Sequence, residues 1–244
     1  MNKYAELDKL KDRLNEYRKG EHSKVTKALE IEYTYESNKI EGNTLTLQET
    51  ALVVEKGLTI GGKTMTEHLE VINHTHAIDF IKDLAQSKNT ISERDILQIH
   101  SLILQGIDKP NAGVYRKVPV IISGAKHKPP QPFLVPKQME DLILWYNENK
   151  EVLHPVELSA QMHERLVTIH PFIDGNGRAS RLLMNLILLQ NGYPIAILKG
   201  DDKSRLEYYN ALELAQTEDN KKVFIELIAK NIQEAIQRIL SIFE

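Results

Sequence analysis

The stretch HPFIDGNGRASR, residues 170 to 181, concentrates groups that can do chemistry between two apolar helical segments. Gly175, Asn176 and Gly177 can present successive backbone N–H groups into one concavity, a geometry that binds anions. The helix that follows adds its own unpaired N–H groups and the positive end of its dipole. The pattern therefore predicts an anion site at the start of a helix.

Two arginines indicate which anion this site binds. Arg178 and Arg181 are three residues apart and so share one face of the first turns of the helix. Cations at a helix N-terminus are unfavourable against the dipole unless an anion is bound there. A guanidinium binds phosphate oxygens with two parallel hydrogen bonds, so phosphate is the expected anion.

Asp174 and His170 add two functions beside the predicted phosphate. A carboxylate is a hard oxygen ligand, and Mg²⁺ in proteins typically takes one or two carboxylates together with substrate phosphates. A neutral imidazole at His170 could accept a proton from an attacking hydroxyl. Each signal alone is weak, because a histidine before a proline is more often structural, but their concentration within one short stretch favours a catalytic site.

Other histidines are weaker candidates. His68, His74 and His76 share one predicted helix, but their spacing does not place them on one face as metal ligands, so we interpret them as exposed or hydrogen-bonded. His163 is interpreted as a core residue or a support for the site. His127, in a predicted turn, is either a substrate contact or a solvated side chain.

The elements that must position these residues are mostly helical. Pairs of Thr and Glu three residues apart, at Thr46, Thr64 and Thr90, predict capping boxes at three helix starts. Apolar periodicity predicts helices that end at Gly20, that span residues 23–42, 46–56, 177–190, 203–217 and 221–243, and that follow Thr64, Thr90, Pro136 and Pro155.

Residues 106–136 break the helical pattern. They are rich in Gly and Pro and contain the β-branched run from Val118 to Ile122. We predict a loop and one short strand pair with a turn around residues 123–126, limited to an edge hairpin by its prolines. No linker or repeat divides the chain, which favours one mostly α domain.

Composition limits the function classes. The 244 residues are 41% hydrophobic and carry a net charge of −3, which is typical of a soluble globular protein without the basic excess of a nucleic-acid binder. There is no cysteine, so disulfides and thiolate metal sites are excluded. No apolar run reaches the length of a membrane span, and the charged N-terminus lacks the apolar core of a signal peptide. We expect a cytoplasmic protein with neither nucleic acid nor membrane as a partner.

HPFIDGNGRASR resembles the signature of the Fic (Fido) family, H-P-F-x-D/E-G-N-G-R-x-x-R, at every fixed position. AGVYRKVPVIISGAKHKPP resembles the family's flap, which lies over the target segment, and SRLEYYNAL resembles the helix whose paired tyrosines help to form the base pocket. The resemblance covers most of residues 20–220. It implies a mainly α fold, a Fic-type helical bundle with one short β-hairpin, the flap, beside the active site. It divides the chain into an N-terminal helical region, residues 1–90, and a catalytic core with C-terminal helices, residues 91–244, packed as one compact unit.

The resemblance implies a Mg²⁺-dependent protein adenylyltransferase. Such an enzyme moves AMP from ATP to a Ser, Thr or Tyr hydroxyl of a protein, which could be the chain itself, and releases pyrophosphate. By the resemblance His170 is the general base, Asp174 holds Mg²⁺ between the α- and β-phosphates, and Arg178 and Arg181 stabilise the β- and γ-phosphates. The remaining implied site residues are Gly175, Asn176 and Gly177 around the phosphates, Val120, Ile121, Ile122 and Ser123 in the flap, and Tyr208 and Tyr209 at the base. Gly177 favours AMP transfer, because the related Doc kinases carry Lys there. Gln216 departs from the Asn that relatives often have.

Residues 37–43, SNKIEGN, end the predicted helix 23–42 with an acid where the helix dipole disfavours negative charge. They match the S/T-x-x-x-E-G/N pattern of the inhibitory helix that some Fic proteins carry at the N-terminal side (class II type). The resemblance implies that Glu41 pairs with Arg181 in the space that the γ-phosphate needs, and that Ser37 anchors the helix.

Alternatives remain open from the sequence. The same site could remove AMP from a modified protein, transfer another nucleotide, or serve a catalytically quiet nucleotide-binding module. A homodimer is compatible with the resemblance, and the sequence does not indicate the target protein.

Overall fold

A computed structural model of the chain describes residues 3–17 and 23–243, and the regular elements within them are all helices. The predicted helix end at Gly20 lies outside the described residues. The elements are α1 (Ala5–Tyr17), α2 (Ser23–Ile40), α3 (Leu47–Lys56), α4 (Met65–Ser87), α5 (Glu93–Ile103), the 3₁₀ helix η1 (Pro132–Leu134), α6 (Val135–Asn149), α7 (Pro155–Ile169), α8 (Asn176–Gln190), α9 (Asp202–Thr217) and α10 (Lys221–Phe243). The expected mainly α fold is confirmed.

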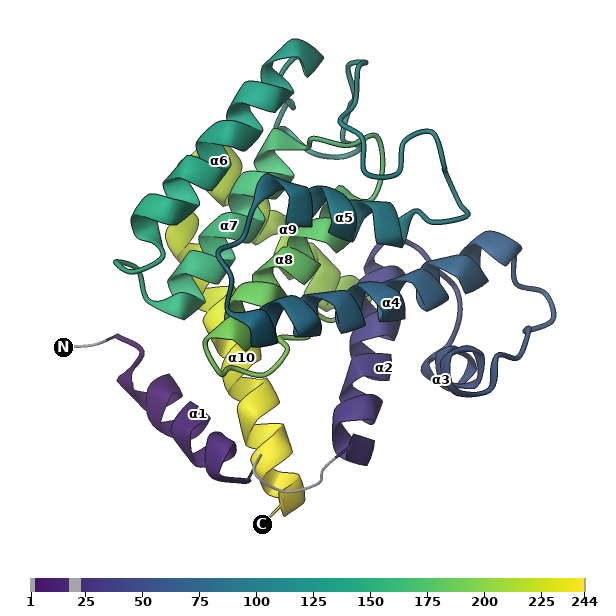
Figure 1. The fold of residues 1–244 in the computed structure, drawn as a ribbon, viewed down its shortest axis with the longest axis vertical. Helices are drawn as coiled ribbons and strands as arrows, with labels where there is room; N and C mark the ends of the chain where they lie inside the picture. Colours follow the sequence, from purple (N-terminus) through teal and green to yellow (C-terminus); the bar gives the residue numbers. More distant parts are fainter. Residues whose placement is uncertain (1–2, 18–22, 244) are drawn as a thin grey trace.

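The hairpin of α7 and α8 forms the centre of the bundle (Figure 1). Helices α4 and α5 pack on α8, α6 and α10 pack on α7, and α9 packs on α10. Helix α1 lies along α10, and α3 packs against both α2 and α4 (Figure 1). Residues of α8 from Ala179 to Leu188 are buried on all sides, which explains why this helix is apolar almost throughout.

Capping boxes fix where several helices begin. The boxes predicted at Thr46 and Thr64 are confirmed: each hydroxyl accepts from the backbone N–H of the residue three positions later, and the glutamate there accepts from the threonine N–H. The third predicted box, at Thr90, is wrong, because Ser92 with Asp95 caps α5 instead. Both pairs have the required spacing, so spacing alone does not choose between them.

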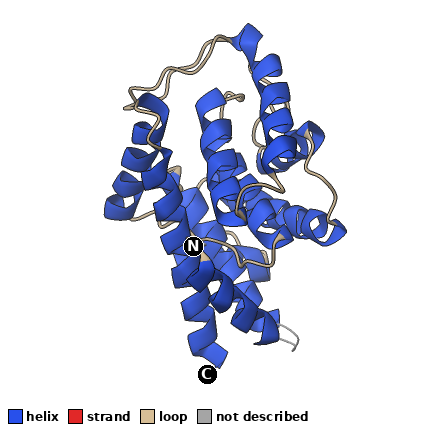
Figure 2. Cartoon of the chain, turned by 90° about the vertical axis from the view of Figure 1, so that its left-hand side faces the viewer, coloured by secondary structure: helices blue, strands red, loops and turns tan. Residues whose placement is uncertain are grey.

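The predicted strand pair in residues 118–130 is wrong. In the described part of the chain there is no β-strand, and no strand is drawn in Figure 2. Pro119, Pro129 and Pro130 have no N–H to donate, so the two arms cannot form a continuous ladder. The β-branched run also has nothing to pack against, since Ile121 is 93% exposed. The Fic-type bundle expected from the sequence therefore has an extended, turn-containing loop where the hairpin was predicted.

Ion pairs along α2 attach this helix to three neighbours. Glu30 accepts from Lys82 of α4 at 2.5 Å, and Glu32 accepts from both Lys199 and Arg238 at 2.5 Å. The boundary predicted near residue 90 stays a prediction. These contacts nevertheless show that the N-terminal helices and the later ones pack against each other.

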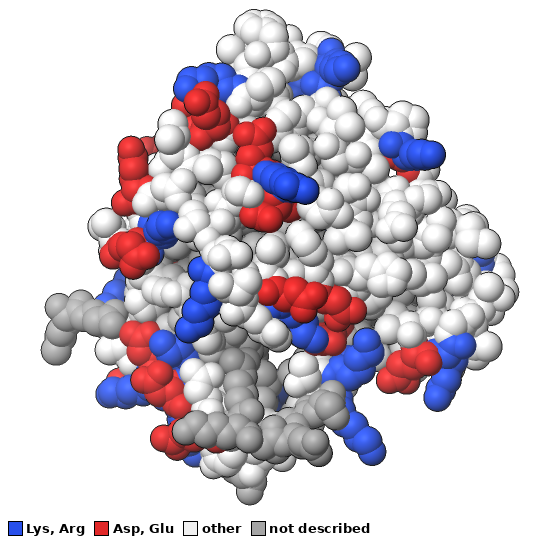
Figure 3. Space-filling view, in the orientation of Figure 1, with Lys and Arg blue, Asp and Glu red and all other residues white. Residues whose placement is uncertain are grey.

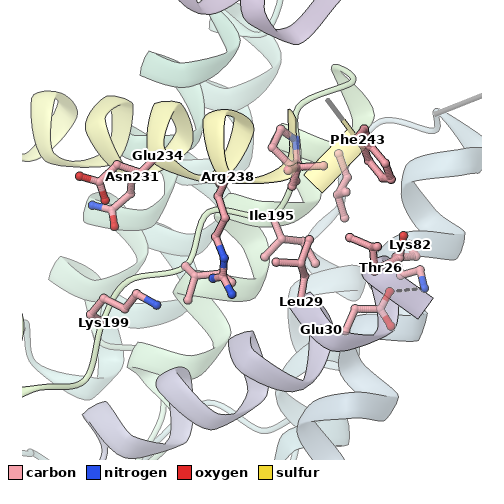
Figure 4. Close-up of a pocket in the computed structure, with 16 residues that line it drawn as sticks. Thr26, Leu29, Glu30, Lys82, Ile195, Lys199, Asn231, Glu234, Arg238 and Phe243 are labelled. Carbon is pink, nitrogen blue, oxygen red and sulfur yellow. Dashed lines mark hydrogen bonds and ion pairs between the residues drawn. The ribbon is translucent and has the colours of Figure 1, made fainter. Parts of the chain in front are cut away.

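A cavity of about 320 Å³ lies between the first half of α2, helix α10 and residues 194–199 (Figure 4). Its walls are mostly apolar, with Leu29, Ile195 and Phe243 among them, and Glu30 and Lys82 pair at its edge. No residue of the stretch 170–181 lines it. This cavity is therefore separate from the predicted phosphate site.

Charged side chains of both signs are interspersed on the face shown in Figure 3. Of the helices that the structure describes, none combines the length and the apolar character that crossing a bilayer requires.

Two buried histidines predict a pH-dependent stability. Burial lowers the pKa of His74 and His163 well below the usual value, so the unfolded chain, with ordinary pKa values near 6.5, takes up protons first as the pH falls. Stability present above pH 6.5 is therefore lost on acidification. The free energy of unfolding, measured with urea, should fall between pH 7.5 and pH 5.5. His163→Gln should reduce the slope of this free energy against pH by up to about 1.4 kcal/mol per pH unit. The exposed His76→Gln is the control, and equal slopes in the wild type and His163→Gln would contradict the prediction.

Candidate active site

The stretch 170–181 forms the connection between α7 and α8. His170 ends α7 in the left-handed conformation (φ 50°, ψ 58°), which costs a residue other than glycine about 1–2 kcal/mol. Gly175 (φ 77°) turns the chain into α8, and a Cβ at this position would meet the His100 ring at 3.2 Å. The loop thus places His170 at one end and the first N–H groups of α8 at the other.

Asn176 holds this loop closed. Its side chain accepts from the Phe172 N–H at 3.0 Å and donates to the Phe172 carbonyl at 2.9 Å. The amide predicted to contact phosphate is therefore engaged with the loop itself. Backbone N–H groups at the start of α8 remain the anion-binding groups of the turn, since the first N–H groups of a helix have no partner within it.

Arg178 is buried between two carboxylates. Its guanidinium donates to Asp174 Oδ2 and to Glu70 Oε1, both at 3.0 Å. Only 2% of its side chain is exposed, against 63% of Asp174. Arg178 therefore orients the exposed carboxylate of Asp174. Glu70 of α4, which the sequence did not indicate, is the second acidic partner of this arginine.

Arg181 is the second buried cation and connects α8 to the end of α2. It donates through Nε to Ser37 Oγ and through Nη2 to the Ser37 carbonyl, each at 3.0 Å, and Nη2 also lies 2.6 Å from Glu41 Oε1. Burial alone would lower the pKa of Arg181, but the Glu41 carboxylate outweighs this effect and raises it. The pair predicted between Glu41 and Arg181 is present.

Gly177 fits this arrangement because it has no side chain. A Cβ at this position would overlap the Glu41 carboxylate and would lie 3.0 Å from Arg181 Nη1. Arg181 Nη1 is buried and has no hydrogen-bond partner among the described residues, and the same is true of Arg178 Nε and His170 Nδ1. The site therefore holds polar groups that a bound ligand could satisfy.

The imidazole of His170 is neutral at physiological pH. Burial lowers its pKa to about 4, the backbone of Val167 opposes this change, and the charges of Arg116 and His127 add to the lowering. His127 belongs to the loop above the site and shares a hydrogen bond with the Thr168 carbonyl at 2.8 Å. Its ring is therefore anchored to α7 rather than solvated at a turn tip.

The residues predicted for the base pocket and flap lie in different environments. Tyr208 is buried, with its hydroxyl 3.0 Å from His163 Nε2, whereas Tyr209 is 45% exposed beside the end of α2. Gln216 donates to Thr168 Oγ1 at 3.2 Å. Of the flap residues, Ile121 and Ser123 are exposed, and Val120 and Ile122 are partly buried.

His100 of α5 is a site residue that sequence reasoning missed. Its ring stacks on Phe172, with ring centres 3.6 Å apart and planes 3° apart. Nδ1 accepts from the Gly113 N–H at 2.9 Å, so Nε2 carries the proton and donates to the Asp174 carbonyl at 2.9 Å. His100 thus ties the loop of the motif to the segment after α5.

Known proteins are similar to this chain in both sequence and structure. The Fic/DOC family model matches residues 90–188. A solved structure of Fic-1 from Caenorhabditis elegans is 33% identical, with a TM-score of 0.85 over 98% of this chain and 71% of that chain. The chain belongs to the Fic/DOC family.

Other Fic proteins share most of this chain. A Fic-domain signalling protein from Bacteroides thetaiotaomicron is 28% identical, with a TM-score of 0.81 over 96% of both chains. The protein adenylyltransferase Fic of Nematostella vectensis is 38% identical over 86% of this chain and 49% of its own length. The chain spans about half the length of the curated relatives it matches. The Fic similarity includes α2, because both solved structures cover nearly the whole chain.

The contacts of His100 predict its effect on stability. His100→Phe keeps the stack on Phe172 but leaves the Gly113 N–H and the Asp174 carbonyl without their partner, so unfolding free energy should fall by about 1–3 kcal/mol. Urea unfolding measures this value. The exposed His76→Phe should stay within about 0.5 kcal/mol of the wild type. A loss as small as that in His100→Phe would contradict the prediction.

Proposed function

We propose that this Fic protein is a protein adenylyltransferase, which moves AMP from ATP to a Ser, Thr or Tyr hydroxyl of a protein and releases pyrophosphate. One observation carries the proposal: a neutral, partly buried His170 and the anion-binding start of α8 are the two ends of one short loop. Relatives such as the Nematostella vectensis protein, at 38% identity, carry the name protein adenylyltransferase.

In the proposed reaction the oxygen of the target hydroxyl attacks the α-phosphorus of ATP. A new oxygen–phosphorus bond forms while the bond to the α–β bridging oxygen breaks, so pyrophosphate leaves with that electron pair. His170 accepts the proton of the hydroxyl. Because its pKa is about 4, the imidazole is unprotonated near pH 7 and ready to accept, as a positioned acceptor rather than a strong base.

The phosphates of ATP would bind at the start of α8. Backbone N–H groups there and the unpartnered Nη1 of Arg181 offer donors to phosphate oxygens. Among the described residues, no group of three or more acidic or histidine side chains could hold a metal by itself. One exposed carboxylate, Asp174, fits a Mg²⁺ ion that arrives with ATP and takes most of its ligands from phosphates and water. Bound there, Mg²⁺ would neutralise phosphate charge.

The target protein would approach from the side of the loop over residues 118–130. Ile121, 93% exposed in this loop, and Phe133, 77% exposed in η1 just after it, offer apolar side chains, which suit a protein segment better than a small polar acceptor. His127 keeps this loop against α7 through the Thr168 carbonyl, two residues before His170. The substrate class in the proposal is therefore a protein side chain with a hydroxyl group.

Glu41 is proposed as an internal inhibitor of this reaction. It occupies Arg181 and the space beside Gly177, where a phosphate would otherwise bind. Ser37, one turn earlier, fixes the same guanidinium through its hydroxyl and its carbonyl. ATP would have to compete with this carboxylate for its γ-phosphate contact.

AMP transfer predicts covalent labelling from ATP. Incubation with Mg²⁺ and ATP labelled at the α-phosphate should leave label on protein, in a cell lysate or on the chain itself, and His170→Ala should reduce it at least 100-fold. ATP labelled at the γ-phosphate is the control and should leave none. Label from the γ-phosphate, or none from either with Glu41→Gly, would contradict the proposed reaction.

If Glu41 inhibits the reaction by pairing with Arg181, removing the Glu41 carboxylate should raise the rate of AMP transfer. Glu41→Gly should raise the initial rate of labelling at least tenfold, because Arg181 becomes free for phosphate, and Glu41→Gln should give a smaller increase since it keeps the volume but not the charge. ATP affinity, measured by calorimetry with His170→Ala present to prevent turnover, should rise in parallel. An unchanged rate in Glu41→Gly would refute inhibition by this residue.

A further inference from the structure

Arg116 is a buried cation without an acidic partner. Its side chain is 2% exposed, and within the described residues it forms no ion pair. The guanidinium donates instead to three backbone carbonyls, of His170, Val118 and Pro130. A buried charge is expensive, and an apolar side chain of similar volume is often as stable or more stable in such a place. Stability alone therefore does not explain an arginine here, and the fixed geometry of its donors points to positioning.

One end of this arginine fixes the backbone of the proposed base. Arg116 Nε donates to the His170 carbonyl at 2.8 Å, and the Arg116 backbone N–H donates to the Pro171 carbonyl at 2.9 Å. Two successive carbonyls of the motif are therefore held by one residue. Because His170 has the left-handed backbone, this hold restrains a conformation that is strained on its own.

The other end of the side chain holds the two ends of the loop formed by residues 118–130. Nη1 donates to the Val118 carbonyl at 3.2 Å and Nη2 to the Pro130 carbonyl at 2.6 Å. Prolines prevent a ladder between the two arms of this loop, as shown above. The guanidinium therefore provides the cross-connection that backbone pairs would provide in a hairpin.

We propose that Arg116 is a positioning residue that holds the base His170 and the target-facing loop in one fixed geometry. The inference rests on the proposed transfer of AMP. A planar fork with several donors can span three carbonyls at once, whereas a lysine can satisfy fewer of them from a single nitrogen. The positive charge of Arg116 and the planar shape of its guanidinium then have separate effects. Arg116→Gln removes both, whereas Arg116→Lys removes only the planar shape.

The charge acts on His170. The charged and titratable groups that influence this imidazole are Arg116 and His127 from the loop and Glu41 from the end of α2. Arg116 favours the neutral imidazole, so Arg116→Gln should raise the pKa of His170 by roughly one unit, while Arg116→Lys should leave it nearly unchanged. Histidine NMR of the intact chain measures this pKa, with His170→Gln to assign the signal. The acid limb of the pH–rate profile should move to higher pH in Arg116→Gln only.

The fork acts on geometry. With α-labelled ATP in a cell lysate and in the Glu41→Gly background, Arg116→Lys should reduce labelling at least tenfold even though its charge is kept. ATP affinity should change less than twofold, because the hydrogen bonds of Arg116 go to His170, Pro171, Val118 and Pro130 and to none of residues 174–181. Lys117→Gln removes an exposed charge one residue away and should change neither measurement.

The outcomes separate this inference from the proposed function. Wild-type labelling and an unmoved His170 titration in both Arg116 variants would overturn it. If no protein is labelled by any variant, AMP transfer fails, yet the NMR titration still tests the effect on His170. Arg116→Lys keeps the test informative if Arg116→Gln does not fold, because retained labelling in Arg116→Lys would by itself refute the role of the fork.

Discussion

The buried guanidinium of Arg181 is the constraint around which the site is built. A cation that is 1% exposed must have acceptors. Ser37, in the last turn of α2, and Glu41, just after that helix, provide them across 144 and 140 residues of chain. Removing one partner of a buried pair typically costs about 3–5 kcal/mol, less where the partner is partly exposed as Glu41 is. A triphosphate would provide equivalent acceptors. The need of buried Arg181 for acceptors therefore explains why the end of α2 packs here and why a bound anion could replace the Glu41 carboxylate.

Most of α2 is held by contacts that have nothing to do with Arg181. Glu30 and Glu32 bind cations of α4, α10 and the segment before α9, and Glu36 accepts from the Gly200 N–H at 2.7 Å. Glu41 lies just beyond the last helical residue, and about a third of its side chain is exposed. Moving the helix would break all of these contacts, whereas turning one side chain breaks one. The least costly way to free Arg181 is thus local.

Local interactions made much of this fold predictable, and distant ones did not. The boxes at Thr46 and Thr64 need only two residues three apart, so the sequence displays them. The pair of Glu41 with Arg181 was found only because both residues belong to recognisable motifs. His100 and Glu70 belong to none, and Arg116 lies in the flap-like stretch without a role that the resemblance implies. Each of the three meets the motif across 54 to 108 residues of chain. Periodicity describes which face of a helix is buried, not which carbonyl a buried side chain meets. The prediction of a strand pair was wrong for a related reason. A β-branched residue favours a strand only where it packs against neighbouring side chains and pairs with a second strand, and this exposed, proline-containing segment has neither.

The twelve-residue motif therefore does not fix its own geometry, because residues outside it hold its backbone and side chains in place. Its histidine is in a strained backbone conformation that Arg116 restrains, its carboxylate is oriented by Arg178 and Glu70, and its glycine turn rests on His100. Three of these supports, Arg116, Glu70 and His100, are remote from the motif in sequence. Helices α4 and α5, which carry Glu70 and His100, pack on α8. A phosphoryl-transfer site needs donors and a proton acceptor fixed before the substrate arrives, since positioning and charge stabilisation supply most of the catalysis. For the transfer proposed here, the helical bundle would supply that fixation through Arg116, Glu70 and His100.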